Sequence, residues 1–376
     1  MHKSRLDDGS IFTEFTGLHV NIKLGKMKVM HKPKYYTRQI AQWILALLAA
    51  LFIMNLLAFT FYNPCQELVR NQGSTTGFLL PDSIGVYGLE GYCIANIDDK
   101  GYVNRSLPRS DSYIIVAGAS HTEGLFIPLK YRYSDILNGM IDPKDDELHV
   151  YNIGKSGNFF SVVLQHLDGI ISEFPDAGAY IIETDSLAYD TKALYDSTIQ
   201  TGFDPDETAQ SILSSLSNRQ QFTIKLKQSL PLARELHKQY LTYEESKADP
   251  SESDTLDPAF WEEEYNGGFY EALDSLMAFI RSKTDKQVII LYHPAISLKE
   301  DGTMELLTNG AEPYYREACK NHGIDFVDMS DRFLKAYEED GIIPYGFNNT
   351  TPGSGHINRP AHRMIAEELY NVLSVD

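Results

Sequence analysis

An uncharged run near the N-terminus places the strongest constraint on how this chain can fold. Residues 40–62 read IAQWILALLAALFIMNLLAFTFY, 23 residues without a charged side chain. A helix over this run would be roughly 34 Å long, and the hydrocarbon core of a bilayer is about 30 Å thick. Trp43, Phe61 and Tyr62 lie where interfacial aromatic side chains are common. The run therefore predicts one transmembrane helix rather than a buried core helix or a cleaved signal peptide, because it is long, uncharged and followed by no A-x-A-like site.

The charges that flank this run predict its orientation. Residues 1–39 form a basic tail with eight Lys or Arg against three acidic residues, whereas Glu67 and Arg70 follow the run. Because basic flanks favour the cytoplasmic side, we expect the N-terminus in the cytoplasm. The remaining 314 residues are then extracytoplasmic, in a single-pass protein of the cell membrane.

The remaining charge and the cysteines limit the classes of partner and cofactor. The net charge is −19 over the whole chain and −24 after the basic tail, so nucleic acid is not an expected partner. Cys65, Cys93 and Cys319 show no CxxC or Cys/His spacing, so neither a zinc site nor any other cofactor is expected. Cys65 and Cys93 can pair in an exported domain, and two buried free thiols fit the sequence equally well.

The rest of the chain alternates between strand-like and helix-like patterns. Residues 63–110 form a turn-rich juxtamembrane segment with an expected hairpin around residues 98–101. Five apolar runs follow, at residues 113–116, 148–153, 179–182, 288–292 and 325–328, with amphipathic stretches at 160–173 and 269–282. The alternation predicts an α/β domain over residues 111–376 with three layers, a parallel sheet flanked by helices. In such sheets, functional residues gather at the carboxyl ends of the strands.

One segment, residues 187–268, interrupts this alternation. It combines helical periodicity over residues 209–243 with an acidic stretch, EESKADPSESDTLD, at residues 244–257. We interpret it as a mainly helical insertion. It can cover a sheet edge or the site, and a solvated elaboration without function is the better supported alternative.

Two residues at expected element ends suit nucleophilic catalysis. GASHTEG at residues 118–124 places Ser120 on a strand-to-helix turn between glycines, which can expose the hydroxyl and direct the N–H of Ser120 toward an anion. Alone, this serine is more typical of a helix N-cap. His356 precedes an expected terminal helix at residues 363–373, where it can act as a general base to Ser120. A lone histidine is usually structural, so the prediction depends on the pair.

The order and spacing of these motifs resemble the SGNH (GDSL-like) hydrolase family over about residues 111–373. GASHTEG is similar to the first family block, which makes Ser120 the nucleophile. YNIGKSGNFFS resembles the second block, whose last glycine, here Gly157, donates a backbone N–H to the oxyanion. HINRPAHRMIAEEL resembles the fifth block and places the catalytic base at His356. The resemblance implies an SGNH or flavodoxin-like fold and an oxyanion hole formed by Ser120 and Gly157.

Two departures from the family pattern concern the site. The third block, G-x-N-D, aligns with ETDS at residues 183–186, so Asp185 replaces an oxyanion-donating asparagine. An ionised carboxylate cannot donate a hydrogen bond, so Asp185 is protonated, points away or has another role. The acid that the family has three residues before the base is also absent, because that position is Gly353. Another group then orients His356, or the site works as a Ser-His dyad.

These features predict a membrane-anchored serine esterase or O-acyltransferase that acts on acyl esters of cell-envelope glycans or glycolipids. By analogy with anchored family members, a multi-pass membrane acyltransferase is an expected partner. The alternative is a non-catalytic binding or assembly module of an envelope-modification complex. The other histidines near the site receive structural interpretations: we expect His121 exposed at a helix start, His293 in local hydrogen bonds, and His362 packed against the last helix.

Overall fold

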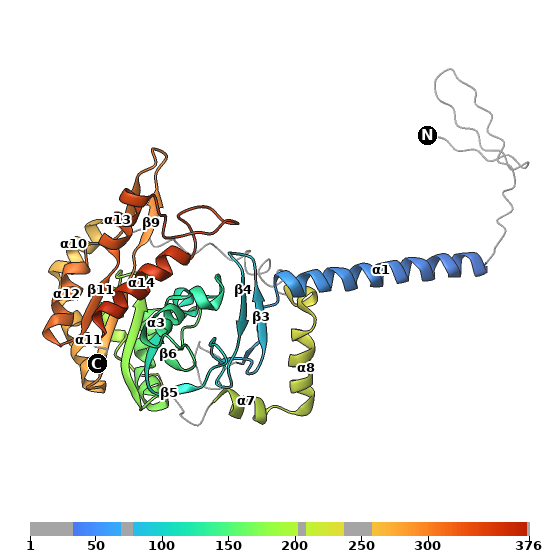
Figure 1. The fold of residues 1–376 in the computed structure, drawn as a ribbon, viewed down its shortest axis with the longest axis horizontal. Helices are drawn as coiled ribbons and strands as arrows, with labels where there is room; N and C mark the ends of the chain where they lie inside the picture. The colour runs from blue at the N-terminus through green and yellow to red at the C-terminus, as the bar shows by residue number, and fades with distance from the viewer. Residues whose placement is uncertain (1–32, 69–77, 202–207, 237–257, 374–376) are drawn as a thin grey trace, which may run out of the picture. The chain divides into compact units, whose positions relative to one another are not determined.

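The computed structural model describes residues 33–68, 78–201, 208–236 and 258–373, and the acidic stretch predicted at residues 244–257 lies outside them. The chain divides into two compact units, one that ends at Met54 and one that begins at Asn55. Figure 1 shows the elements of both.

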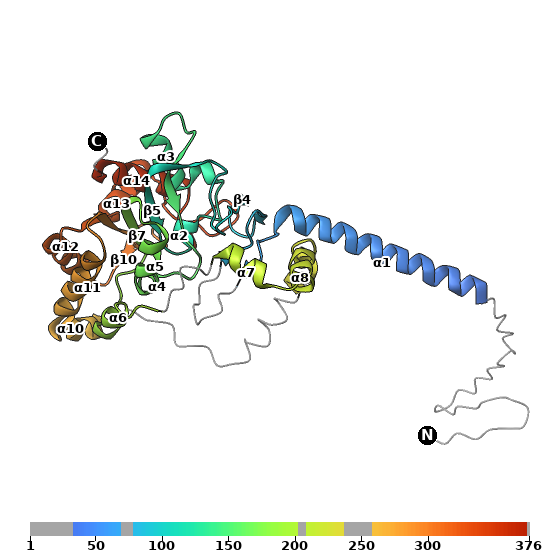
Figure 2. The same ribbon diagram turned by 90° about the horizontal axis from the view of Figure 1, so that it is seen from below.

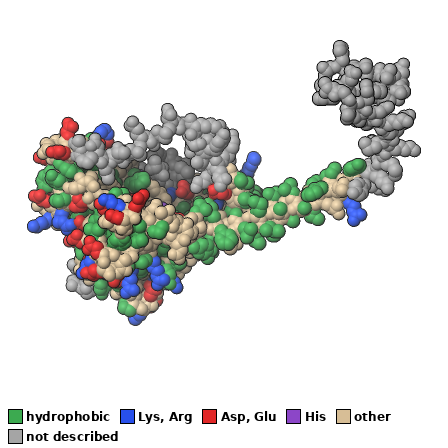
Figure 3. All heavy atoms as spheres, turned by 90° about the horizontal axis from the view of Figure 1, so that it is seen from above, with side chains coloured by type: hydrophobic (Ala, Val, Ile, Leu, Met, Phe, Trp, Pro, Cys, Tyr) green, Lys and Arg blue, Asp and Glu red, His purple; other side chains and the backbone are tan. Residues whose placement is uncertain are grey.

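The N-terminal apolar run forms helix α1 (Pro33–Phe61). Among the described residues, this is the one helix that is long and apolar enough to cross a membrane, over the 26 residues Tyr36–Phe61. At 1.5 Å per residue this segment is about 39 Å long, more than the roughly 30 Å of a hydrocarbon core. Hydrophobic side chains cover the helix in the view of Figure 3. The prediction of one apolar helix of membrane-spanning length is confirmed.

The α/β domain is built on a parallel sheet of five strands in the order β11-β8-β7-β5-β6. The strands are β5 (Arg109–Ala117), β6 (Leu148–Asn152), β7 (Ala177–Thr184), β8 (Gln287–Tyr292) and β11 (Asp325–Asp328). Each contains or overlaps one of the five predicted apolar runs. The runs are continuous rather than alternating because both faces of a parallel sheet are buried.

Helices cover both faces of this sheet, as Figure 2 shows. On one face lie α3 (Tyr133–Ile141), α13 (Ser330–Asp340) and α14 (Arg359–Val372); on the other lie α4 (Phe160–Gln165), α5 (Leu167–Glu173), α11 (Phe269–Lys283) and α12 (Glu312–Asn321). Successive strand residues face opposite layers: Ile289 packs toward α3, α13 and α14, and Ile290 packs toward α4, α5, α11 and α12. The predicted three-layer fold is confirmed.

The segment before the sheet holds two small antiparallel pairs. β1 (Glu67–Leu68) pairs with β2 (Phe78–Leu79), and β3 (Ile84–Tyr87) pairs with β4 (Cys93–Asn96). The turn expected at residues 98–101 is present, and the longer hairpin is the β3–β4 pair just before it. That turn closes a single bridge, Ile97 to Val103, and is held by Asp98 Oδ1, which accepts the N–H groups of Lys100 and Tyr102.

The remaining helices and strands lie outside the central sheet and the helices that cover it. The 187–268 segment contains α6 (Thr191–Asp196), α7 (Ala209–Ser215), α8 (Asn218–Gln228) and α10 (Pro258–Asn266). Strands β9 (Ala295–Leu298) and β10 (Met304–Leu307) form a hairpin after β8. Between β5 and α3 lie the four-residue helix α2 (Ser120–Glu123) and the short 3-10 helix η1 (Leu129–Tyr131).

All three cysteines are buried free thiols. Burial raises the pKa of Cys65, and it raises the pKa of Cys93 and of Cys319 to about 12. Because the thiolate is the nucleophile, these thiols are slow to react in the folded protein. Of the two alternatives open at the sequence level, the structure has the free thiols.

We therefore expect all three cysteines to be alkylated by iodoacetamide in denatured protein that has not been reduced. In the native protein the same reaction should be slow, because the thiols are buried and protonated. Mass spectrometry of the alkylated peptides measures both. If Cys65 and Cys93 were alkylated only after reduction, they would form a disulfide, and this expectation would be contradicted.

Candidate active site

Residues of the candidate site follow four strands of the sheet at their carboxyl ends. Ser120 follows β5, Gly157 follows β6, Asp185 follows β7 and His293 follows β8. Because the strands are parallel, these ends share one edge of the sheet. His356 lies at the same edge, in the loop before α14.

Ser120 and His356, 236 positions apart, lie within hydrogen-bond distance. Ser120 Oγ is 2.8 Å from His356 Nε2. This is the geometry that a serine nucleophile and its general base require. The sequence predicted both residues, and their roles in catalysis are proposed below.

A carboxylate that the sequence analysis missed completes the arrangement. Glu90 Oε2 lies 2.7 Å from His356 Nδ1, and Glu90 Oε1 accepts the backbone N–H of His356 at 2.7 Å. Glu90 belongs to the turn between β3 and β4, 266 positions before His356. With Nδ1 protonated toward Glu90, Nε2 is left as the acceptor for the Ser120 hydroxyl.

The backbone at this contact explains the glycine before His356. Gly355 has φ +83°, and a Cβ there would lie 2.1 Å from Glu90 Oε1. The Glu90 turn is also tied to the histidine loop by Asn349, whose Oδ1 accepts the N–H of Gly91 at 2.8 Å. Gly353, at the position where the family has its acid, packs near Leu298 instead.

The surroundings of His356 favour its neutral form. Burial lowers the pKa of the imidazole and the neighbouring His121 lowers it further, so it lies below the ordinary value of 6.5 although Glu90 acts in the opposite direction. The ring of Phe126 stacks on the imidazole with centroids 3.7 Å apart. A neutral imidazole is the form that can accept a proton at neutral pH.

The loop that carries Gly157 is held by the side chain of Glu123. Glu123 Oε2 accepts the N–H of Ser156 at 2.9 Å and also the Ser156 hydroxyl. Gly157 has φ +88°, and the space where a Cβ would stand is open. Because Ser156 is fixed and the space beside Gly157 is open, the backbone N–H of Gly157 is suited to donate to a ligand.

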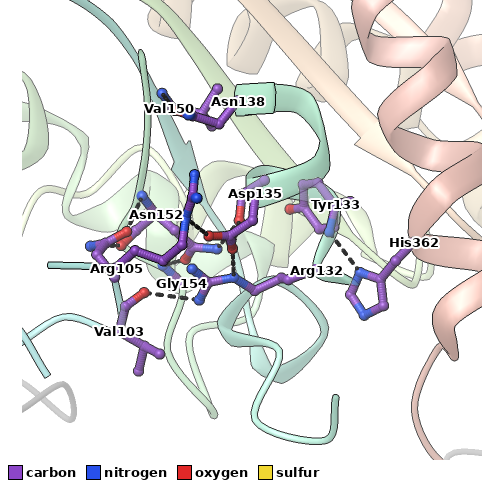
Figure 4. Close-up of polar contacts among 12 residues, drawn as sticks. Val103, Arg105, Arg132, Tyr133, Asp135, Asn138, Val150, Asn152, Gly154 and His362 are labelled. Atoms are coloured by element: carbon purple, nitrogen blue, oxygen red, sulfur yellow. Dashed lines mark hydrogen bonds and ion pairs between the residues drawn. The ribbon is translucent and has the colours of Figure 1, made fainter. Parts of the chain in front are cut away.

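Asn152, the first residue of the N-x-G-x-x-G motif, ties this loop to the nucleophile turn. Its Nδ2 donates to the carbonyl of Thr122 at 2.7 Å, and its Oδ1 accepts the N–H of Gly154 at 2.8 Å. Figure 4 shows Asn152 beside Gly154 and the buried Arg132. The motif asparagine is thus structural, because it fixes the two loops that would form an oxyanion hole.

Arg132 supports the other end of α2. This fully buried side chain donates to the carbonyls of Glu123 and Val103, each at 2.9 Å, and to Asp135 at 2.8 Å. The same part of Figure 4 shows Tyr133, whose N–H donates to Nδ1 of His362 at 3.1 Å. His362 is therefore buried and structural, as the sequence suggested.

Asp185 pairs with His121 rather than with Ser120. Asp185 Oδ2 is 3.5 Å from His121 Nε2, and His121 Nδ1 accepts the N–H of Ile357 at 3.3 Å. Burial raises the pKa of Asp185, but His121 and His293 outweigh burial and bring this pKa to about 2. The carboxylate is ionised, so the protonated form considered at the sequence level is wrong. The expectation of an exposed His121 is also wrong, because its ring packs against those of His293, Tyr345 and His356.

The buried carboxylate of Glu183 holds the turn at residues 118–122, which carries Ser120 and is called the nucleophile turn. Its Oε2 accepts the N–H of Ala119 at 2.9 Å and the hydroxyl of Thr122 at 2.8 Å, and its Oε1 lies 2.9 Å from His293 Nε2. Burial raises the pKa of Glu183, but His293 outweighs burial, so this pKa lies below its ordinary value. His293 is hydrogen-bonded, but its partners Glu183 and Tyr345 are 110 and 52 positions away, so these bonds are not the local ones expected. Within the described ranges, no cluster of three His, Cys, Asp or Glu side chains could hold a metal ion.

We expect Glu90→Gln to lower kcat for p-nitrophenyl acetate by about 10²- to 10⁴-fold, because the amide no longer enforces the reactive tautomer of His356. Glu90 raises the pKa of His356, so the acidic limb of the pH–rate profile should move to lower pH. Glu300→Gln, on an exposed residue, is the matched control. If neither kcat nor the acidic limb of the pH–rate profile changed in Glu90→Gln, Glu90 would have no part in orienting His356.

Asp185→Asn should keep or raise the rate of ester hydrolysis. The amide oxygen can still accept from His121, while its nitrogen adds a donor where a negative charge stood. Asp185→Leu, which loses the contact with His121, should be slower than Asp185→Asn. Steady-state kinetics on both variants measures this, and a tenfold loss in Asp185→Asn would show that the charge itself is needed.

Comparisons with known proteins give a likeness among solved structures. No family model and no curated protein matches the chain. A member of the lipolytic protein G-D-S-L family from Veillonella parvula DSM 2008 is 14% identical, with TM-score 0.34 over 70% of this chain and 98% of that one. An acetyl xylan esterase is 12% identical (TM-score 0.37, 70% and 99%), and esterase EstA from Pseudoalteromonas sp. is 9% identical (TM-score 0.33, 70% and 96%). These structures are GDSL-type or other esterases, which the chain resembles.

Proposed function

We propose that this chain is a membrane-anchored serine esterase or O-acyltransferase of the SGNH type. The hydrogen-bonded series Ser120, His356 and Glu90 carries the proposal. Its three side chains come from three distant parts of the chain and meet with distances of 2.7 and 2.8 Å. A serine that served only as a helix N-cap would not need the half-buried histidine and carboxylate aligned behind it.

The geometry supports a two-step acyl transfer. Ser120 Oγ attacks the ester carbonyl while its proton passes to His356 Nε2, and Glu90 stabilises the imidazolium that forms. The N–H groups of Ser120 and Gly157 would hold the oxyanion of the tetrahedral intermediate. His356 then protonates the leaving alcohol, which departs and leaves an acyl group on Ser120. Attack by water releases the acid, and attack by a sugar hydroxyl gives an O-acyl product.

The location and substrate class extend this proposal. The apolar helix and its basic flank favour a site on the extracytoplasmic side of the cell membrane. Acyl esters of cell-envelope glycans or glycolipids are the substrates within reach there, and a multi-pass membrane acyltransferase is the proposed partner. One observation favours the non-catalytic alternative: the ionised Asp185 stands at the strand end from which the family supplies an oxyanion donor.

The direct test is the reactivity of Ser120. A fluorophosphonate probe should label the full-length protein, and Ser120→Ala should abolish both labelling and ester turnover, because only an activated serine reacts. Ser172→Ala, which changes an exposed serine on α5, is the matched control. Labelling that persists in Ser120→Ala, or wild-type protein that is neither labelled nor active, would favour the binding module.

A further inference from the structure

A cavity of about 440 Å³ lies beside Glu90, the carboxylate that contacts His356. Its volume is within the range of small-ligand sites. The apolar part of its wall includes Cys65, Leu79, Tyr87, Leu89, Leu125 and Phe126. These residues come from the juxtamembrane segment and from the loop after α2.

The cavity is continuous with the surroundings of His356. Glu90 and Phe126 line it, and both contact the imidazole, Glu90 by a hydrogen bond and Phe126 by stacking. Ser156, which precedes Gly157, lines it as well. The cavity therefore shares wall residues with the contacts of His356 and with the loop that carries Gly157.

Several polar side chains in the wall have partners within the protein. Glu90 binds His356, Glu123 binds Ser156, and the Arg234 guanidinium donates to Asn63 and to Gln228. A site for a sugar needs donors and acceptors aimed at the ligand, because buried polar groups that lack partners are costly. The larger part of the cavity wall is aliphatic and aromatic surface, and Gln66, Glu67, Lys155 and Glu235 also line it.

The chain position of the wall indicates where such a ligand comes from. Tyr62 and Pro64 line the cavity and directly follow the apolar helix, which ends at Phe61. Along the chain, they are the wall residues nearest to this helix. The aliphatic tail of an acyl ester fits both the lining and this position.

We propose that this cavity binds the aliphatic chain of a medium-length acyl group, so that the enzyme prefers such esters to acetyl esters. The inference rests on the proposed esterase function and narrows its substrate class. Burial of each methylene corresponds to about fourfold in affinity. Hexanoate, four methylenes longer than acetate, should therefore be favoured at least tenfold in kcat/KM.

The first experiment compares p-nitrophenyl hexanoate with p-nitrophenyl acetate on the full-length protein in detergent. Leu89→Trp narrows the cavity from its exposed rim and should lower the hexanoate-to-acetate ratio of kcat/KM at least tenfold. Ile84→Trp, on an exposed residue of the same hairpin outside the cavity, should keep the wild-type ratio. A wild-type ratio near one, unchanged in Leu89→Trp, overturns the cavity assignment and leaves the esterase proposal intact.

The second experiment needs no turnover. Decanoate in the cavity should slow the reaction of Cys65 with N-ethylmaleimide several-fold, and this protection should weaken in Leu89→Trp. Cys93 and Cys319 do not line the cavity and serve as internal controls. Protection without any ester turnover would support the chain-binding site and contradict the esterase proposal, whereas equal slowing of all three cysteines or none would overturn the cavity assignment.

Discussion

The buried carboxylate of Glu183 is the interaction on which the nucleophile turn depends. It sits at the end of β7 and joins the turn after β5 to His293 after β8, so one side chain sets the positions of three strand ends. Gly118 allows this approach, because a Cβ there would lie 2.3 Å from Glu183 Oε2. Removing one partner from such a buried hydrogen-bonded network costs about 1–3 kcal/mol, because the remaining polar groups are left without a partner. The position of Ser120 is therefore a consequence of burial and charge in the sheet.

His356 is held from two sides by different carboxylates. Glu90 binds it directly, and Asp185 acts through His121, whose Nδ1 accepts the N–H of the next residue, Ile357. Both negative charges raise the pKa of His356, while burial and His121 lower it by more. The balance leaves the imidazole neutral yet close to charges that stabilise its protonated form. This is the property that a general base requires.

The sequence predicted the parts of the molecule that have local signals. Apolar runs locate the five strands, and the GASHTEG and HINRPAH motifs locate the two residues of the hydrogen-bonded pair. Glu90 has no such signal, because it is one of 52 acidic residues and meets His356 only through tertiary folding. The burial of His121 was missed for the same reason: its neighbours His293 and Tyr345 are brought to it by distant segments.

Glu90 lies outside the part of the chain that carries the recognisable motifs. The recognisable motifs begin at β5, yet the carboxylate that orients the histidine lies before it, in a hairpin only 29 residues after the end of α1. A gene fusion or duplication that exchanged only the motif-bearing part would carry the serine and the histidine without the third partner. On the proposed mechanism, a recombination that kept activity would have to include this hairpin together with the motif-bearing part.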